Sequence, residues 1–115
     1  NHGGRQLDGA AASIDVLPEI IDAVAGRMEV LLDSGITSGQ SLLKALALGA
    51  RAGLIGKAFL YGLGAMGEAG VTKAIEIIRK ELDVSMALTG QCDVHGLSSD
   101  ILLRSDGRPY RTHQS

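Results

Sequence analysis

The sequence predicts an α/β fold in which parallel strands are covered by helices, and three observations carry this prediction. Segments with helical and strand-like periodicity alternate along the 115 residues in the order helix, strand, helix, strand, helix. The connections between them are short. Both strand segments are too apolar for a sheet that faces water on one side. Two strands do not make such a sheet, and a complete (β/α)8 barrel needs ~250 residues, so we expect an incomplete barrel.

The first half of the chain contains a helix, a strand and a second helix. A helix is expected from about Ser13 to Gly26, because a helix-start signal is followed by apolar residues at helical spacing. Residues 29–32 form a short apolar run that turn residues 33–35 end, which is typical of a buried strand. A second helix is expected over residues 38–48, because a glycine follows it where a left-handed cap would lie.

The second half adds one strand and one long helix. Residues 52–55 form another apolar run, closed by a glycine and a lysine. From residue 68 to about residue 88 apolar side chains recur on one side and charged side chains on the other, which predicts an amphipathic helix. Beyond residue 90 the periodicity is lost. We therefore divide the chain into a barrel part, residues 1–90, and a tail, residues 91–115, that we expect to be mobile.

Composition and charge exclude several classes of protein. The net charge of −2 and the aromatic content of 3% argue against a nucleic-acid-binding surface, which needs basic side chains and stacking platforms. The single cysteine, Cys92, excludes an internal disulfide. Charged side chains interrupt the apolar middle of the chain, so we expect no transmembrane segment and no signal peptide. The first residue is Asn1 rather than methionine, and we expect a piece of a longer protein.

Glycine directly follows both predicted strands, at Gly35 and at Gly56. In a barrel these loops lie at the carboxyl ends of the strands, where backbone N–H groups and a helix N-terminus commonly hold a phosphate. Lys57 would add a full positive charge. The alternative is that these loops need glycine for their geometry alone, and the two loops by themselves favour neither interpretation.

The opening segment carries the more specific chemistry. His2 can hold or remove a proton near neutral pH, and Arg5 can bind a carboxylate through two parallel hydrogen bonds. Gly3 and Gly4 let the backbone approach a planar ligand closely. Together these residues suit an acid substrate that loses a proton. A glycine-rich loop with an incidental histidine and arginine is the alternative.

Two other patterns are weaker. Residues 62–67 spell G-x-G-x-x-G, but a helical period follows them, which argues against a dinucleotide-binding fold and favours a tight passage between a short and a long helix. Cys92 and His95 have the spacing of half a zinc site, and no second pair accompanies them. We expect no metal site.

Five segments together resemble the C-terminal part of the FMN-dependent 2-hydroxy-acid dehydrogenases and oxidases. The resemblance covers residues 1–90 and fades in the tail. The His-Gly-Gly-Arg-Gln-Leu-Asp signature is peculiar to that family, whereas the middle segments recur in other phosphate-binding barrels. The five segments are Asn1-His2-Gly3-Gly4-Arg5-Gln6-Leu7-Asp8, Asp33-Ser34-Gly35-Ile36, Lys44–Ala50, Phe59–Leu63 and Gly67–Val71.

The resemblance implies a fold, an activity and a site. The chain would form the last two strand–helix units of a (β/α)8 barrel, and the enzyme would oxidise a small L-2-hydroxy acid, with L-lactate the first candidate, to the 2-oxo acid. His2 would be the catalytic base and, with Arg5, would bind the substrate. The residues implied to bind FMN are Asp33, Ser34, Gly35, Ile36, Thr37, Gly56 and Lys57.

The resemblance also implies partners and a location, and this chain differs from the family pattern at two positions. The electron acceptor would be a quinone, a cytochrome or oxygen, the full-length enzyme a homotetramer, and the location cytoplasmic or peripheral to the inner membrane. The family usually has arginine where this chain has Thr37 and Lys57, which predicts weaker FMN binding. The isolated chain is expected neither to close a barrel nor to turn over substrate. Two alternatives remain: a flavin-free phosphate- or nucleotide-binding barrel, and an inactive truncated remnant.

Overall fold

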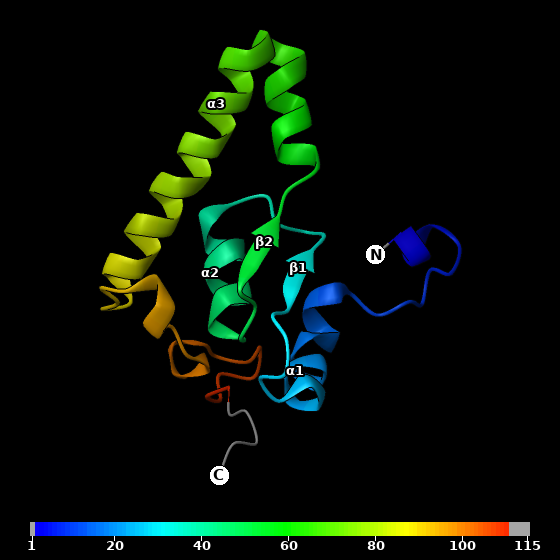
Figure 1. Ribbon diagram of the computed structural model, residues 1–115, viewed down its shortest axis with the longest axis vertical. Helices are drawn as coiled ribbons and strands as arrows, with labels where there is room; N and C mark the ends of the chain where they lie inside the picture. The colour runs from blue at the N-terminus through cyan, green and yellow to red at the C-terminus, as the bar shows by residue number, and fades with distance from the viewer. Residues whose placement is uncertain (1, 111–115) are drawn as a thin grey trace.

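The computed structural model describes residues 2–110, and its elements follow the predicted alternation (Figure 1). A 3-10 helix at the N-terminus precedes three α-helices and two strands, and two further short 3-10 helices follow them. The elements in order are the 3-10 helix His2–Arg5, α1 Ser13–Val24, β1 Leu31–Asp33, α2 Gly39–Ala47, β2 Ala52–Leu54, α3 Lys57–Leu88, and the 3-10 helices Val94–Gly96 and Ser99–Ile101.

The two strands are neighbours and run parallel, as predicted. Leu31 pairs with Ala52, and Asp33 at the end of β1 pairs with Leu54 at the end of β2. Strand β1 begins two residues later than the apolar run suggested, although Val30 still accepts a hydrogen bond from the Arg51 amide at 2.7 Å. Within residues 2–110 these two strands are the whole sheet, so the described chain is an α/β unit and not a closed barrel.

The hydrophobic core lies on one face of this sheet, between the strands and helices α1 and α2. Its centre is Leu17 of α1, which is 1% exposed, together with Leu32 of β1. On the opposite face of the sheet, Leu31 is 54% exposed and Leu54 is 46% exposed. Parallel sheets are normally covered on both faces, so this face is suited to contact with further protein.

Helix α3 folds back on itself as a hairpin that projects beyond the strand ends (Figure 1). Its course breaks at Met66 and at Gly67, where φ is +61°. The two limbs touch where a Cβ on Gly62 would collide with the backbone carbonyl of Gly70. Two glycines of the G-x-G-x-x-G pattern, Gly62 and Gly67, therefore serve a tight passage between a short and a long helical limb, as predicted, because one allows the close contact and the other the turn.

Residues 91–110 follow a defined path back to the core. Leu103 and Pro109 form an isolated antiparallel bridge, and Leu102 and Tyr110 pack against the core cluster. This segment lies below the lower end of α2 (Figure 1). The division of the chain at residue 90 and the mobility of the tail stay predictions, and residues 111–115 lie outside the described residues. Among residues 2–110, no helix is long and apolar enough to cross a membrane.

Candidate active site

A cavity of about 580 Å³ opens at the carboxyl ends of the two strands. Three segments line it: the N-terminal 3-10 helix, the loop between β1 and α2, and the junction of β2 with α3. The set includes every residue that the resemblance assigns to the substrate or to FMN, and also Gly4, Leu54 and Leu60, whereas Gly3 is absent from it. The lining residues are His2, Gly4, Arg5, Asp33, Ser34, Gly35, Ile36, Thr37, Leu54, Gly56, Lys57 and Leu60.

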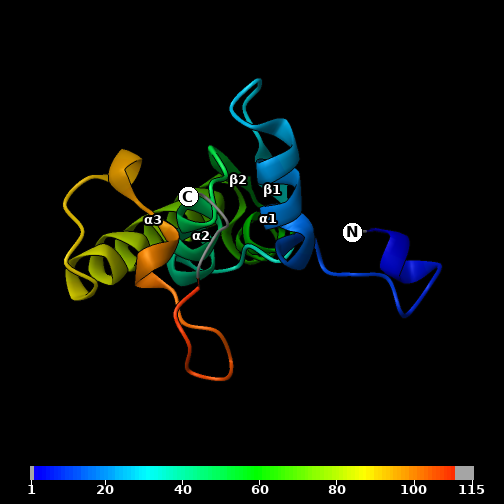
Figure 2. The same ribbon diagram turned by 90° about the horizontal axis from the view of Figure 1, so that it is seen from below.

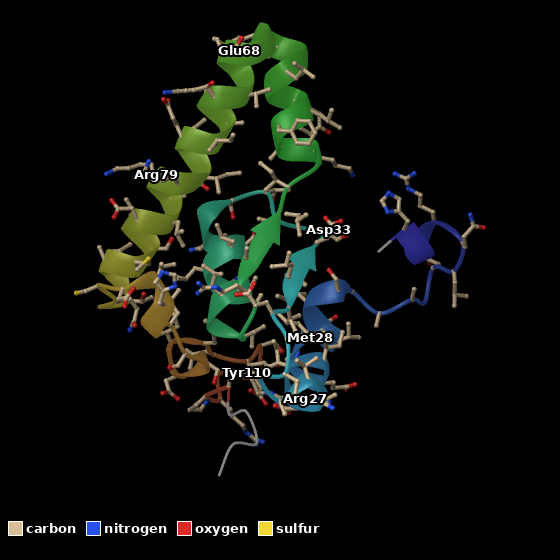
Figure 3. All side chains as sticks on the ribbon, in the orientation of Figure 1. Arg27, Met28, Asp33, Glu68, Arg79 and Tyr110 are labelled. Carbon is tan, nitrogen blue, oxygen red and sulfur yellow. The ribbon has the colours of Figure 1, made fainter. Side chains whose placement is uncertain are left out.

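The loop after β1 is shaped by left-handed backbone at two successive residues. Ser34 has φ +85° and Gly35 has φ +77°, and the Ser34 amide donates to the Asp33 carboxylate at 2.7 Å. Ile36 is 4% exposed and anchors the loop in the core, whereas Thr37 stays exposed. A non-glycine residue in this conformation is strained, and such strain persists only where the surroundings hold it. Asp33 lies at the upper end of β1 (Figure 3) and lines the cavity.

The start of helix α3 forms the opposite wall. Gly56 is the N-cap, and because it has no side chain it provides no capping hydrogen bond to the first amides of the helix. A Cβ at Gly56 would meet no atom within 4 Å, so the space above this helix end is open. Lys57 is the first helical residue and lines the same cavity. Uncapped N–H groups, the helix dipole and a lysine together attract an anion such as a phosphate group.

His2 and Arg5 reach the cavity from its rim. They are the first and last residues of one 3-10 helix, and side chains three residues apart in such a helix lie on the same side. The Gly3 carbonyl accepts from the amides of Gln6 and Leu7, at 3.0 and 2.9 Å. Residues 2–12 are all exposed, and the segment stands apart from the three helices (Figure 2). Its position therefore depends on few contacts within the described chain.

Sequence reasoning missed Leu54 and Leu60 as lining residues. Leu60 lies one helical turn after Lys57, and the alternation along β2 turns Leu54 toward the uncovered face of the sheet. Both positions were readable from periodicity once the helix start and the strand register were known. Cys92 and His95 lie outside this cavity, and among residues 2–110 no cluster of three or more His, Cys, Asp or Glu side chains could hold a metal ion.

Residues 1–104 match a family described as FMN-dependent dehydrogenase. An L-lactate oxidase from Nostoc sp. is 54% identical over 102 residues, which cover 89% of this chain and 28% of that protein. An L-lactate dehydrogenase from Caulobacter vibrioides is also 54% identical over 102 residues, covering 89% of this chain and 27% of that protein.

A solved structure gives the same result. A soluble mutant of the membrane-associated (S)-mandelate dehydrogenase from Pseudomonas putida is 44% identical, with a TM-score of 0.81 over 88% of this chain and 28% of that one. The chain thus spans just over a quarter of the length of these relatives. The match extends from the opening segment into the tail, which argues against a barrel that shares the middle motifs alone. By sequence and by fold, the chain belongs to the FMN-dependent dehydrogenase family.

Proposed function

We propose that this chain supplies the last two strand–helix units of a (β/α)8 barrel whose active site oxidises a small L-2-hydroxy acid with FMN. The observation that carries the proposal is the single cavity in which His2 and Arg5 meet the two glycine loops. Relatives at 54% identity are named for their action on L-lactate, so L-lactate is the first candidate substrate.

The cavity suits a flavin phosphate at its base. The positive-φ turn at Gly35 and the uncapped start of α3 at Gly56 present backbone amides, and Lys57 presents a positive charge. The volume of about 580 Å³ lies in the range of ~300–1,000 Å³ that small-molecule sites occupy. FMN, when bound, supplies the two-electron acceptor, and the residues of this chain orient it and balance its charge. The residues proposed to hold FMN are Asp33, Ser34, Gly35, Ile36, Thr37, Gly56 and Lys57.

His2 and Arg5 would act on the substrate. The Arg5 guanidinium binds the substrate carboxylate through paired hydrogen bonds, which orients the carbon that carries the hydroxyl group. The imidazole of His2 takes one proton from the hydroxy acid. Oxidation to the 2-oxo acid removes two electrons and two protons from the substrate in total, and FMN, when bound, would supply the acceptor for the electrons. His2 removes either the hydroxyl proton, with hydride transfer, or the C2 proton first.

The two-stranded sheet is incomplete, and this limits the activity that we expect of the isolated chain. Leu31 and Leu54 are about half exposed on its uncovered face, and each strand has one unpaired edge within residues 2–110. The remaining strands of a barrel would cover this face and would complete the flavin site. We therefore expect the isolated chain to be inactive, which is the behaviour expected of a truncated remnant as well. The complete enzyme is proposed to be a homotetramer.

The acceptor and the location follow the relatives. The Nostoc relative is named an oxidase and the Caulobacter relative a dehydrogenase, so the acceptor is proposed to be oxygen, a quinone or a cytochrome. The Pseudomonas putida relative is described as membrane-associated. A cytoplasmic protein, or one peripheral to the inner membrane, is accordingly proposed.

A chimera tests this function directly. The 102 matched residues of the Nostoc L-lactate oxidase would be replaced by this chain, so that the relative supplies the missing strands. The purified chimera should bind FMN, and L-lactate should bleach the flavin absorbance without oxygen, whereas D-lactate should leave it unchanged. A folded chimera that binds no flavin, or whose flavin L-lactate does not reduce, would contradict the proposal. The isolated chain serves as the control and should stay colourless.

A further inference from the structure

The loop that lines the cavity is held at its far end by a side chain from another helix. The amide of Gly39, two residues beyond Thr37, donates a hydrogen bond to the Glu81 carboxylate at 2.8 Å. Gly39 is buried, and a buried backbone N–H without an acceptor is costly. Glu81 belongs to the long limb of α3, so the hydrogen bond joins the first residue of α2 to that helix.

The contact between the two helices at this point is very close. A Cβ on Gly39 would collide with the backbone nitrogen of Leu82 and with the backbone carbonyl of Ile78. The other end of the loop is held by the pairing of Asp33 with Leu54. The loop over residues 33–37 is therefore fixed between the sheet and α3, the same two elements that carry the opposite wall of the cavity.

Glu81 also makes the N-terminus of α2 different from the N-terminus of α3, because it places a carboxylate at α2 only. Two amides at the N-terminus of α2 already have side-chain acceptors, because Ser38 Oγ accepts from the Ser41 amide at 3.1 Å and Glu81 accepts from the Gly39 amide. A carboxylate at this end repels a second anion. The N-cap of α3 is Gly56, which has no side chain that could accept from the first amides of the helix, and Lys57 follows it. An anion in the cavity is thus directed to α3.

We propose that Glu81 is a positioning residue for the cofactor phosphate: it holds the start of α2 against α3 and, by occupying that helix end, directs the phosphate to Gly56 and Lys57. The inference rests on the proposed function and deepens it. Glu81 is not among the residues that line the cavity, so it would contact neither flavin nor substrate. It acts through Gly39 and the loop that precedes it.

Glu81→Ala and Glu81→Gln would be compared in the chimera, which contains the full chain. The control is Glu76→Ala, which removes another carboxylate from α3. The Glu76 carboxylate forms an ion pair with the Lys73 ammonium group at 3.6 Å. Dissociation constants for FMN and for riboflavin, which lacks the phosphate, would be measured by flavin fluorescence. Glu81→Ala should raise the FMN dissociation constant about three- to tenfold, as expected for one lost hydrogen bond, and leave riboflavin within about twofold. Glu81→Gln keeps an acceptor oxygen and should restore most of the FMN affinity, and Glu76→Ala should change neither constant.

A second measurement tests the Gly39–Glu81 hydrogen bond independently of cofactor binding. Amide hydrogen exchange at Gly39 should be at least several-fold faster in Glu81→Ala than in the parent or in Glu76→Ala, whether or not flavin is present. Equal weakening of FMN and riboflavin, or no weakening, would overturn the positioning role and leave the proposed function standing. A parent chimera that binds neither flavin would overturn the proposed function and the cofactor role together. Unchanged exchange at Gly39 would overturn the contact itself.

Discussion

His2 and Arg5 occupy the first and last positions of one 3-10 helix, and both side chains line the cavity at the carboxyl ends of β1 and β2. The three-residue spacing brings an imidazole and a guanidinium to the same side of the backbone. In the proposed reaction the guanidinium holds the substrate carboxylate while the imidazole takes a proton. The two residues therefore make separate and measurable contributions.

His2→Ala in the chimera should lower kcat by ~10²–10⁴-fold, the usual contribution of a positioned acid–base group, because the hydroxy acid then has no base at hydrogen-bonding distance. FMN should remain bound with unchanged affinity, since the phosphate loops are intact. Stopped-flow reduction of the flavin by L-lactate measures the effect. Wild-type reduction rates in this variant would show that His2 is not the base.

Arg5→Lys should chiefly weaken substrate capture. Lysine keeps the charge but loses the planar fork that makes two hydrogen bonds to a carboxylate, so kcat/KM should fall by at least about tenfold, mainly through a higher KM. The control is the affinity for riboflavin, which should not change. An unaltered KM for L-lactate would remove Arg5 from the substrate site.

Thr37→Arg and Lys57→Arg should each tighten FMN binding. Both positions line the cavity near the proposed phosphate site, and a guanidinium offers paired donors where threonine offers one hydroxyl and lysine a point charge. We expect the FMN dissociation constant to fall by about three- to tenfold in each variant, the gain of roughly one good hydrogen bond. Riboflavin titrations provide the comparison, because a gain shared by both flavins would place the new side chain away from the phosphate.

Gly62→Ala and Gly64→Ala should have opposite effects on stability, although they lie two residues apart on α3. A Cβ at position 62 would collide with the backbone of Gly70, and such overpacking typically costs ~1–3 kcal/mol. A Cβ at position 64 meets no atom within 4 Å, and replacing a helical glycine with alanine typically stabilises by ~0.5–1 kcal/mol. Urea unfolding of the two chimeras measures both free energies. Equal stabilities would mean that the two limbs of α3 do not touch at Gly62.

Much of the fold was readable from the sequence because it depends on local pattern. The 3.6-residue period marked α1, α2 and the long limb of α3 from residue 68, and the short apolar runs marked the two strands. The period did not mark the first limb of α3, which begins at Lys57. The start of β1 was predicted two residues early, because an apolar run does not reveal where its partner begins: the register of Leu31 with Ala52 settles it. The path of Leu102 and Tyr110 back to the core was also missed, because two isolated apolar residues carry no period.

Glycine after each strand, the lysine that follows Gly56 and the His-x-x-Arg spacing were local signals of chemistry in the sequence. The roles of these residues and the full set of FMN-binding residues came from the resemblance to a known family. The tertiary structure decided that these signals from three separate segments share one cavity, because parallel strands bring their carboxyl ends to the same edge. It alone revealed that Glu81 reaches Gly39, a contact between residues far apart in the chain that no periodicity encodes. Local preference depends on neighbours in sequence, whereas a site depends on which distant backbones pack closely enough to touch.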